Sequence, residues 1–228
     1  MSVGCLFVGK EANRLAPPGL EETGQALRFF QISQRLLGCT EYRDLRALQA
    51  ICFMVIFLQS SARLSTCHFY IGIALRSATR LGLHRSVSTI FDPVERELRK
   101  RVFWTIQKMD IYLSTLLGLP QMLSDDDIDQ QYPLDLDAQF IAEARILPMP
   151  PDFTPLMAGA NAHTRLSSIM SKVIKRVYPV KDVDYCAGQR YFVSYSRIQE
   201  IEGDLRDWME GLPDGLLPKG EAPPQLQR

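Results

Sequence analysis

The sequence predicts an all-α fold, an irregular bundle of several helices. Apolar residues recur at helical spacing in six segments, glycine or proline residues punctuate their ends, and no segment shows convincing strand alternation. The chain has 228 residues, of which 46% are hydrophobic and 23% charged, as in an ordinary globular domain. The longest apolar run, residues 50–58, is shorter than the roughly 20 residues that cross a bilayer. It therefore indicates a buried helix, and no membrane partner is expected.

The first two helices are predicted at residues 25–37 and 44–60. The apolar positions of the first are Leu27, Phe30, Ile32, Leu36 and Leu37. Gly38 ends this helix, and residues 1–24 before it are expected to be poorly structured. Asp44 is placed to cap the second helix, whose far half is apolar all round and is therefore expected to be deeply buried.

A third helix is predicted at residues 65–81, with Gly82 after it as a left-handed C-cap. Leu83 is expected to fold back and supply the hydrophobic contact that accompanies such a cap. The helical spacing is set by Cys67, Ile71, Ala74, Ala78 and Leu81. Gly72 and the alanines leave room for close packing, so we expect the next helix to dock on this side.

The clearest element is a fourth helix over residues 92–118. Asp92 is a good N-cap, Pro93 fits the first helical position, and Gly118 with Pro120 stops the helix. One face is marked by Leu98, Val102, Ile106, Met109, Leu113 and Leu116. Phe103 and Trp104 are predicted to be core anchors.

The second half of the chain begins with an acidic loop. Residues 124–137 hold six aspartates, and Ser124 or Asp125 can cap a short turn there. Residues 147–155 contain four prolines and are predicted to form a connector between this loop and two further helices, at 155–177 and 185–209. Residues 211–228 are predicted to be a flexible tail, so the helical domain spans residues 25–210.

No catalytic or metal site is predicted. Asp125, Asp127 and Asp129 have the spacing of a calcium loop, but Gln130 and Leu136 replace its required Gly and Glu, which favours a solvated acidic loop. The three histidines, His68, His84 and His163, lie at no metal-ligand spacing. Nucleophile elbows, phosphate loops and dinucleotide fingerprints are missing, so the chain is not expected to be an enzyme.

Charge and cysteine usage argue against a domain that binds DNA by itself and against a disulfide-rich or zinc-binding protein. Lys plus Arg and Asp plus Glu both number 26, so the chain lacks the basic excess of a domain that grips DNA by itself. Five cysteines are an odd number and form no CxxC pair, which argues against a disulfide framework or structural zinc and favours a reducing compartment. The N-terminus lacks the basic leader and apolar stretch of a signal peptide.

Asp110 lies at the margin of the apolar stripe of the fourth helix. A carboxylate there must be solvated or paired. We expect an ion pair with an arginine of the preceding helix and turn, and an exposed aspartate is the alternative of comparable weight. The candidate arginines are Arg76, Arg80 and Arg85.

Three stretches within residues 65–133 resemble the fungal-specific transcription factor domain, the middle homology region of zinc binuclear cluster regulators, of the xylanolytic-activator type. They read YIGIALRSATRLGLHRS (70–86), DPVERELRKRVFWTIQKMDIYLSTLLGLP (92–120) and LSDDDIDQQYP (123–133). The motif residues that we take as candidate sites are Gly82, His84, Arg85, Glu97, Arg101, Phe103, Trp104, Asp110, Gly118, Pro120, Asp127, Asp129 and Pro133. The chain departs from the pattern at Leu119 and Ile111, where the family carries arginine.

The resemblance implies a regulator of RNA polymerase II transcription in a fungal nucleus. None of the six cysteines of the family's zinc cluster is found, so the chain is expected to be an incomplete, truncated domain. DNA would then be contacted only through a missing zinc-cluster domain, and no cofactor is expected in this chain. Protein partners, a homodimer and a small-molecule effector stay open. A helical binding scaffold unconnected to transcription, and an enzyme on a helical fold, are the alternatives.

Overall fold

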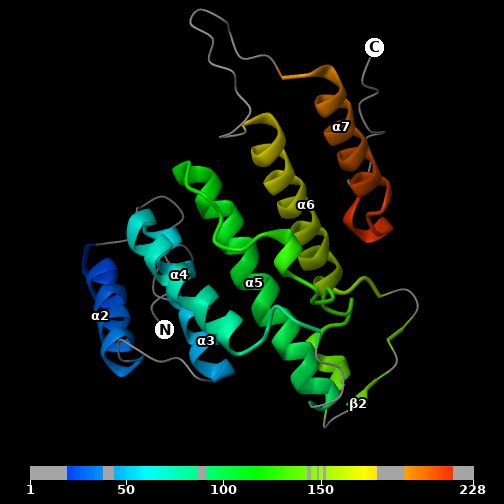
Figure 1. Ribbon diagram of the computed structural model, residues 1–228. Coiled ribbons are helices and arrows are strands. Elements are labelled where there is room, and N and C mark those ends of the chain that lie inside the picture. Colours follow the sequence, from blue (N-terminus) through cyan, green and yellow to red (C-terminus); the bar gives the residue numbers. More distant parts are fainter. Residues whose placement is uncertain are drawn as a thin grey trace, which may run out of the picture. The chain divides into compact units, whose positions relative to one another are not determined.

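The computed structural model describes residues 20–37, 44–86, 91–142, 145–147, 149–150, 153–178 and 193–217, and most of these are helical (Figure 1). The all-α prediction is confirmed. The helices are α2 (Leu20–Leu37), α3 (Leu45–Ser60), α4 (Leu64–Arg80), α5 (Pro93–Leu117), α6 (Leu156–Val177) and α7 (Tyr195–Glu210). Three short 3-10 turns are η1 (Asp125–Asp127), η2 (Ala138–Phe140) and η3 (Asp214–Leu216). The single small sheet pairs β1 (Ile141–Ala142) antiparallel with β2 (Arg145–Ile146).

The helix boundaries differ from the prediction at two places. α2 begins at Leu20, five residues before the predicted start, and residues 1–19 lie outside the described residues. α7 begins at Tyr195, and residues 179–192, where its predicted start falls, are also outside them. Of the predicted tail, η3 is ordered as a turn and residues 218–228 are not described.

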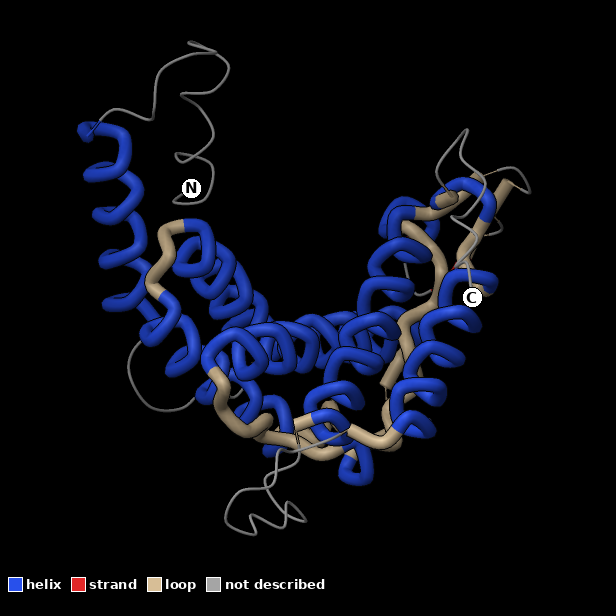
Figure 2. Tube along the Cα trace, turned by 90° about the horizontal axis from the view of Figure 1, so that it is seen from above, coloured by secondary structure: helices blue, strands red, loops and turns tan. Residues whose placement is uncertain are grey.

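The described chain divides into two compact units. Both consist of helices connected by loops, which Figure 2 draws in blue and tan. Unit 1 contains α2, α3, α4, α5 from Leu98 onward and the segment that ends at Gln131. Unit 2 contains the first turn of α5, up to Glu97, and the chain from Tyr132 onward.

The core of unit 1 is built where α3 packs against α4. α3 is buried on most sides, as its apolar far half predicts, with Leu48, Ile51 and Leu58 fully inside. α2 joins this pair through Phe30, whose ring stacks on Phe57 at 5.1 Å.

The predicted apolar side of α2 is only partly correct. Phe30 is 3% exposed, whereas Ile32 is 49% and Leu36 82% exposed. The reason is that α2 contacts α3 along the narrow side that carries Ala26 and Phe30, so the neighbouring apolar positions remain in solvent.

The C-terminus of α4 has the predicted glycine cap. Gly82 adopts a φ of +71°, which glycine alone takes without steric cost. Its N–H donates to the Thr79 carbonyl, and the Leu83 N–H reaches back to the Ala78 carbonyl, both at 3.0 Å. Leu83 is fully buried, as expected for a side chain that folds back after the cap.

The buried face of α5 differs from the predicted apolar stripe. Asp92 caps the helix as predicted, accepting hydrogen bonds from the N–H groups of Val94 at 2.9 Å and Glu95 at 3.0 Å. Leu98 and Leu116, at the ends of the stripe, are 38% and 54% exposed. The middle of the stripe is buried as predicted, at Val102, Ile106 and Leu113. The buried face also includes Phe103 and four polar residues, which are Glu97, Gln107, Asp110 and Ser114.

Unit 2 is built differently, on small and polar residues. α6 packs against α7. The buried residues of α6 are Ala158, Asn161, Ala162, Thr164, Ser167 and Ser171. α7 contributes Ile201 to this interface, and the Trp208 indole N–H donates to the Ala162 carbonyl at 2.8 Å. The Lys172 ammonium forms ion pairs with Asp204 and, at 2.8 Å, with Glu200.

Replacing Gly82 should test the cap. An alanine at a positive φ costs about 1 kcal/mol, so Gly82→Ala should lower the free energy of unfolding of unit 1 by roughly that amount. Urea denaturation followed by circular dichroism measures this change. Gly24→Ala is the matched control: it lies inside α2 with open space around its Cα, so it should leave stability equal or raise it by up to about 1 kcal/mol. Equal losses in the two variants would contradict the prediction.

Candidate functional site

The segment after α5, residues 119–131, lies within unit 1 and has little secondary structure of its own beyond η1. We call it the strap. Ser124 caps η1, as predicted, in a capping box in which the Asp127 carboxylate accepts the Ser124 N–H at 3.3 Å. Because the strap has few internal hydrogen bonds, its position depends on partners from α4, α5 and the turn after α4.

The C-terminal end of the strap binds the turn that follows α4. The Asp129 N–H donates to the His84 carbonyl at 3.2 Å, and the Asp129 carboxylate accepts the Ser86 N–H at 2.8 Å. The Gln130 side-chain amide donates to the carbonyls of Leu83 and Arg85, both at 2.9 Å. These four hydrogen bonds pin residues 129–130 against backbone groups that lie beyond the helix end.

The same end of the strap also binds α5. The Trp104 indole N–H donates to the Gln131 carbonyl at 2.9 Å, and the Lys100 ammonium donates to the Gln131 side chain at 3.1 Å. The Arg99 guanidinium donates to the Leu81 carbonyl at 2.7 Å, which ties α5 to the end of α4. We call this network the motif junction: residues 81–86, residues 129–131, and Arg99, Lys100 and Trp104.

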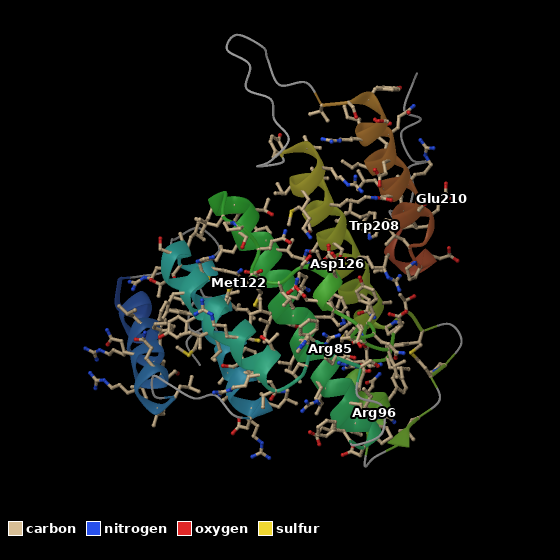
Figure 3. All side chains as sticks on the ribbon, viewed as in Figure 1. Arg85, Arg96, Met122, Asp126, Trp208 and Glu210 are labelled. Atoms are coloured by element: carbon tan, nitrogen blue, oxygen red, sulfur yellow. The ribbon has the colours of Figure 1, made fainter. Side chains whose placement is uncertain are left out.

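The N-terminal end of the strap is held by Asp110. This carboxylate is fully buried and accepts hydrogen bonds from the Met122 N–H at 3.0 Å and the Ser114 hydroxyl at 3.3 Å. The Met122 sulfur lies at Gly72, 3.4 Å from where a Cβ would stand (Figure 3 labels Met122). At Gly72, therefore, the room that the sequence predicts for a neighbouring helix is taken by the strap.

The predicted ion pair of Asp110 is wrong, and so is the exposed alternative. Among the described residues its hydrogen-bond donors are a backbone N–H and a serine, while Arg85 lies 3.9 Å from Asp129. Burial raises the pKa of the Asp110 carboxyl, and the hydrogen bonds from Met122 and Ser114 oppose that rise. Asp110 is therefore a positioning group for the strap.

The remaining motif residues also have structural positions. Phe103 is fully buried and its ring meets Trp104 edge-on at 5.4 Å, so both are core anchors as predicted. Gly118 has a φ of +66°, which ends α5. Burial, with help from the neighbouring Arg85 charge, lowers the pKa of His84. Arg101 is half-buried, and Pro120 and Asp127 are exposed.

Two motif residues belong to unit 2. Glu97 is 3% exposed and its carboxylate accepts the Leu134 N–H at 3.1 Å. The Pro133 carbonyl accepts a hydrogen bond from the Asn161 amide at 2.7 Å. Both interactions fix the chain where it leaves Tyr132, in the same way that the motif junction fixes the strap.

Sequence reasoning missed Gln130, Gln131 and Asn161. Each of these side chains bonds at least one backbone carbonyl or long side chain far away in the sequence, at separations of 26 to 47 residues. Gln130 and Gln131 lie in a polar loop and Asn161 lies in α6, and at neither place does a local pattern mark an amide that bonds a distant residue. Only the resemblance of residues 123–133 points to the region of the two glutamines.

The residues that could hold a metal do not form a site. Within the described ranges, no group of three His, Cys, Asp or Glu side chains is arranged to hold a metal ion. Cys52 and Cys67 are buried free thiols, and burial raises their pKa values to about 12 and about 11. Neutral thiols of this kind are poor zinc ligands, so these two do not fit the zinc cluster of the resemblance. Cys5, Cys39 and Cys186 lie outside the described residues.

A family model described as the fungal specific transcription factor domain matches residues 1–210. The chain belongs to this family. The domain is 39% identical over its whole length to Activator of stress genes 1 of Saccharomyces cerevisiae, of which it covers 23%. Over 87% of the chain it is 40% identical to Activator of stress genes protein 1 of Candida albicans, of which it covers 21%.

A third relative is the Transcriptional activator protein acu-15 of Neurospora crassa, which is 32% identical over 74% of the chain and of which 18% is covered. The domain thus spans about a fifth of the length of these relatives. No solved structure matches the chain. In the part of the chain that the structure describes, no helix is long and apolar enough to cross a bilayer.

The burial of Asp110 predicts a pH-dependent effect of Asp110→Asn. A raised pKa means that the folded protein keeps this proton to higher pH than the unfolded chain, so stability is lost as pH rises above 3.8 through the folded pKa. Asparagine carries no charge, so the stability of Asp110→Asn relative to the parent protein should increase over this range. Urea denaturation of both proteins between pH 4 and pH 7 measures the difference.

Asp110→Ala is the companion variant. It leaves the Met122 N–H without its acceptor, so it should lower the free energy of unfolding by about 1–3 kcal/mol at each pH. A stability difference between Asp110→Asn and the parent protein that stays constant with pH would show that Asp110 keeps its ordinary pKa.

The buried thiols predict selective alkylation. Cys52 and Cys67 should remain unmodified by iodoacetamide at pH 8 in the folded protein, because both are protonated and inaccessible. Both should react fully in urea. Peptide mass spectrometry reads each cysteine separately, and rapid labelling of either one under native conditions would contradict its burial.

Proposed function

We propose that this domain is the regulatory, middle homology part of a fungal zinc-cluster transcription factor, and that it tunes RNA polymerase II transcription in the nucleus. Family membership and the printed names of its relatives support this role. The observation that carries the proposal is the motif junction, because the three motif stretches of the family meet there in one hydrogen-bonded network.

DNA binding is proposed to lie outside this domain, in a zinc cluster of the longer protein. The domain has 26 basic and 26 acidic residues. This balance supports a DNA-binding site elsewhere in the protein, since phosphate contacts need a basic excess. We propose no cofactor and no catalysis for the domain. Its contribution is then conformational, through protein partners, self-association or an effector.

The motif junction suits a regulatory element on energetic grounds. Each of its hydrogen bonds has a net value of about 1 kcal/mol, so a change in two or three of them amounts to a few kcal/mol. That is the size of the free energy by which a bound effector or partner shifts an equilibrium between two packings. The junction is also within reach of solvent, since the Arg85 and Asp129 side chains are 56% and 58% exposed.

A reporter assay tests this proposal. The domain is placed between an unrelated DNA-binding domain and an unrelated activation domain in a fungal reporter strain. Reporter output should differ at least threefold from that of the same fusion without the domain. Trp104→Phe combined with Gln130→Ala, which removes three hydrogen bonds of the junction, should move the output back toward the fusion without the domain.

Asp126→Asn is the matched control, because Asp126 lies exposed in the strap and outside the motif junction (Figure 3 labels Asp126). It should behave as the parent fusion at equal protein abundance, measured by immunoblotting. If the parent domain leaves reporter output unchanged at equal abundance, the transcriptional role is refuted and a binding scaffold unconnected to transcription is favoured.

A further inference from the structure

Unit 2 contains a pocket of about 140 Å³ between the first half of α6 and the C-terminal end of α7. Trp208 forms one wall, and its orientation is fixed by the hydrogen bond from its indole N–H to the Ala162 carbonyl (Figure 3 labels Trp208). Ala162 and Leu212 add further apolar surface. The pocket is partly open to solvent, and its volume is large enough for one small organic molecule.

Charged groups of both signs line the same pocket without neutralising each other. Arg165 and Asp207 both face it, yet they form no ion pair with each other within the described residues. The Arg165 guanidinium lies over the Tyr132 ring, 5.6 Å from its centroid, and the Arg165 side chain is exposed. Asp135 provides a second carboxylate, which is held by the Asn161 amide at 2.7 Å.

This arrangement specifies the chemistry of a ligand. A guanidinium binds a carboxylate through two parallel hydrogen bonds, and an aspartate accepts the hydrogen bonds of an ammonium group. Separate opposite charges on one pocket therefore complement a molecule that carries both charges at one end, while the indole and leucine surfaces complement an apolar body.

We infer that this pocket binds a small apolar amino acid as its zwitterion, with the ligand carboxylate on Arg165 and the ligand ammonium on Asp207. Asp135 adds negative charge near the ammonium, and the side chain of the ligand packs against Trp208. The inference goes beyond the proposed transcriptional role, because binding by unit 2 is measured without any readout of transcription.

Fluorine NMR of the full chain tests the inference. The chain has two tryptophans, so labelling with 5-fluorotryptophan yields two signals, which Trp104→Phe assigns. Titration with L-leucine should shift the Trp208 signal saturably and leave the Trp104 signal in place. Isoamylamine and 4-methylpentanoate, which keep the apolar body and carry one charge each, should bind at least tenfold more weakly.

Matched variants separate the two charge contacts. Arg165→Gln and Asp207→Asn should each weaken leucine binding at least tenfold, and Glu202→Gln, an exposed position of α7 outside the pocket, should leave it unchanged. No saturable shift of the Trp208 signal, or equal binding of leucine and either analogue, overturns the inference. The analogue titrations use the parent chain, so they decide the matter even if a pocket variant fails to fold.

Discussion

A chain segment without secondary structure must find partners for its backbone polar groups, and unit 1 is organised around this constraint. The strap is held by hydrogen bonds between side chains and backbone groups at its two ends. At one end the buried Asp110 carboxylate accepts the Met122 N–H. At the other, Trp104 donates to the Gln131 carbonyl, and the Gln130 amide crosses to the carbonyls of the turn after α4. Without these partners the strap would lose more in unsatisfied polar groups than it gains by covering α4.

This constraint explains why motif residues of quite different chemistry occur together. Gly82 lets the chain turn back sharply, which brings the carbonyls of Leu83 and Arg85 to where an amide can reach them. Trp104 fills the core with its ring and still presents an N–H to the strap. Asp110 is tolerated inside because the Met122 N–H of the strap and the Ser114 hydroxyl of α5 donate to its carboxylate. Much of the motif is thus a set of contacts around one segment, the strap.

Local signals in the sequence predicted local structure well. The Gly82 cap, the Asp92 cap and the ends of α5 are encoded within a few residues of where they act, so all three were predicted correctly. The partner of Asp110 was not, because a backbone N–H is carried by almost every residue and leaves no trace in the pattern. Periodicity placed the buried Val102, Ile106 and Leu113 of α5 correctly. It counts apolar residues only, so it did not predict the buried polar Glu97, Gln107 and Ser114. The contacts of Gln130 and Asn161 span dozens of residues and had no local signature.

The contrast between the two interiors has a thermodynamic consequence. Unit 1 encloses large side chains such as Leu48, Ile51 and Phe103, whose removal from water is worth roughly 1.5–3 kcal/mol each. The face of α6 inside unit 2 is alanine, serine, threonine and asparagine, and much of its attachment to α7 comes from one indole hydrogen bond and the ion pairs of Lys172. Such pairs weaken as ionic strength rises. We therefore expect unit 2 to be the less stable cooperative unit, which opens at a smaller free energy than the whole fold. A molecule that binds only when α7 is packed on α6 would therefore shift the equilibrium between the closed and open forms of unit 2.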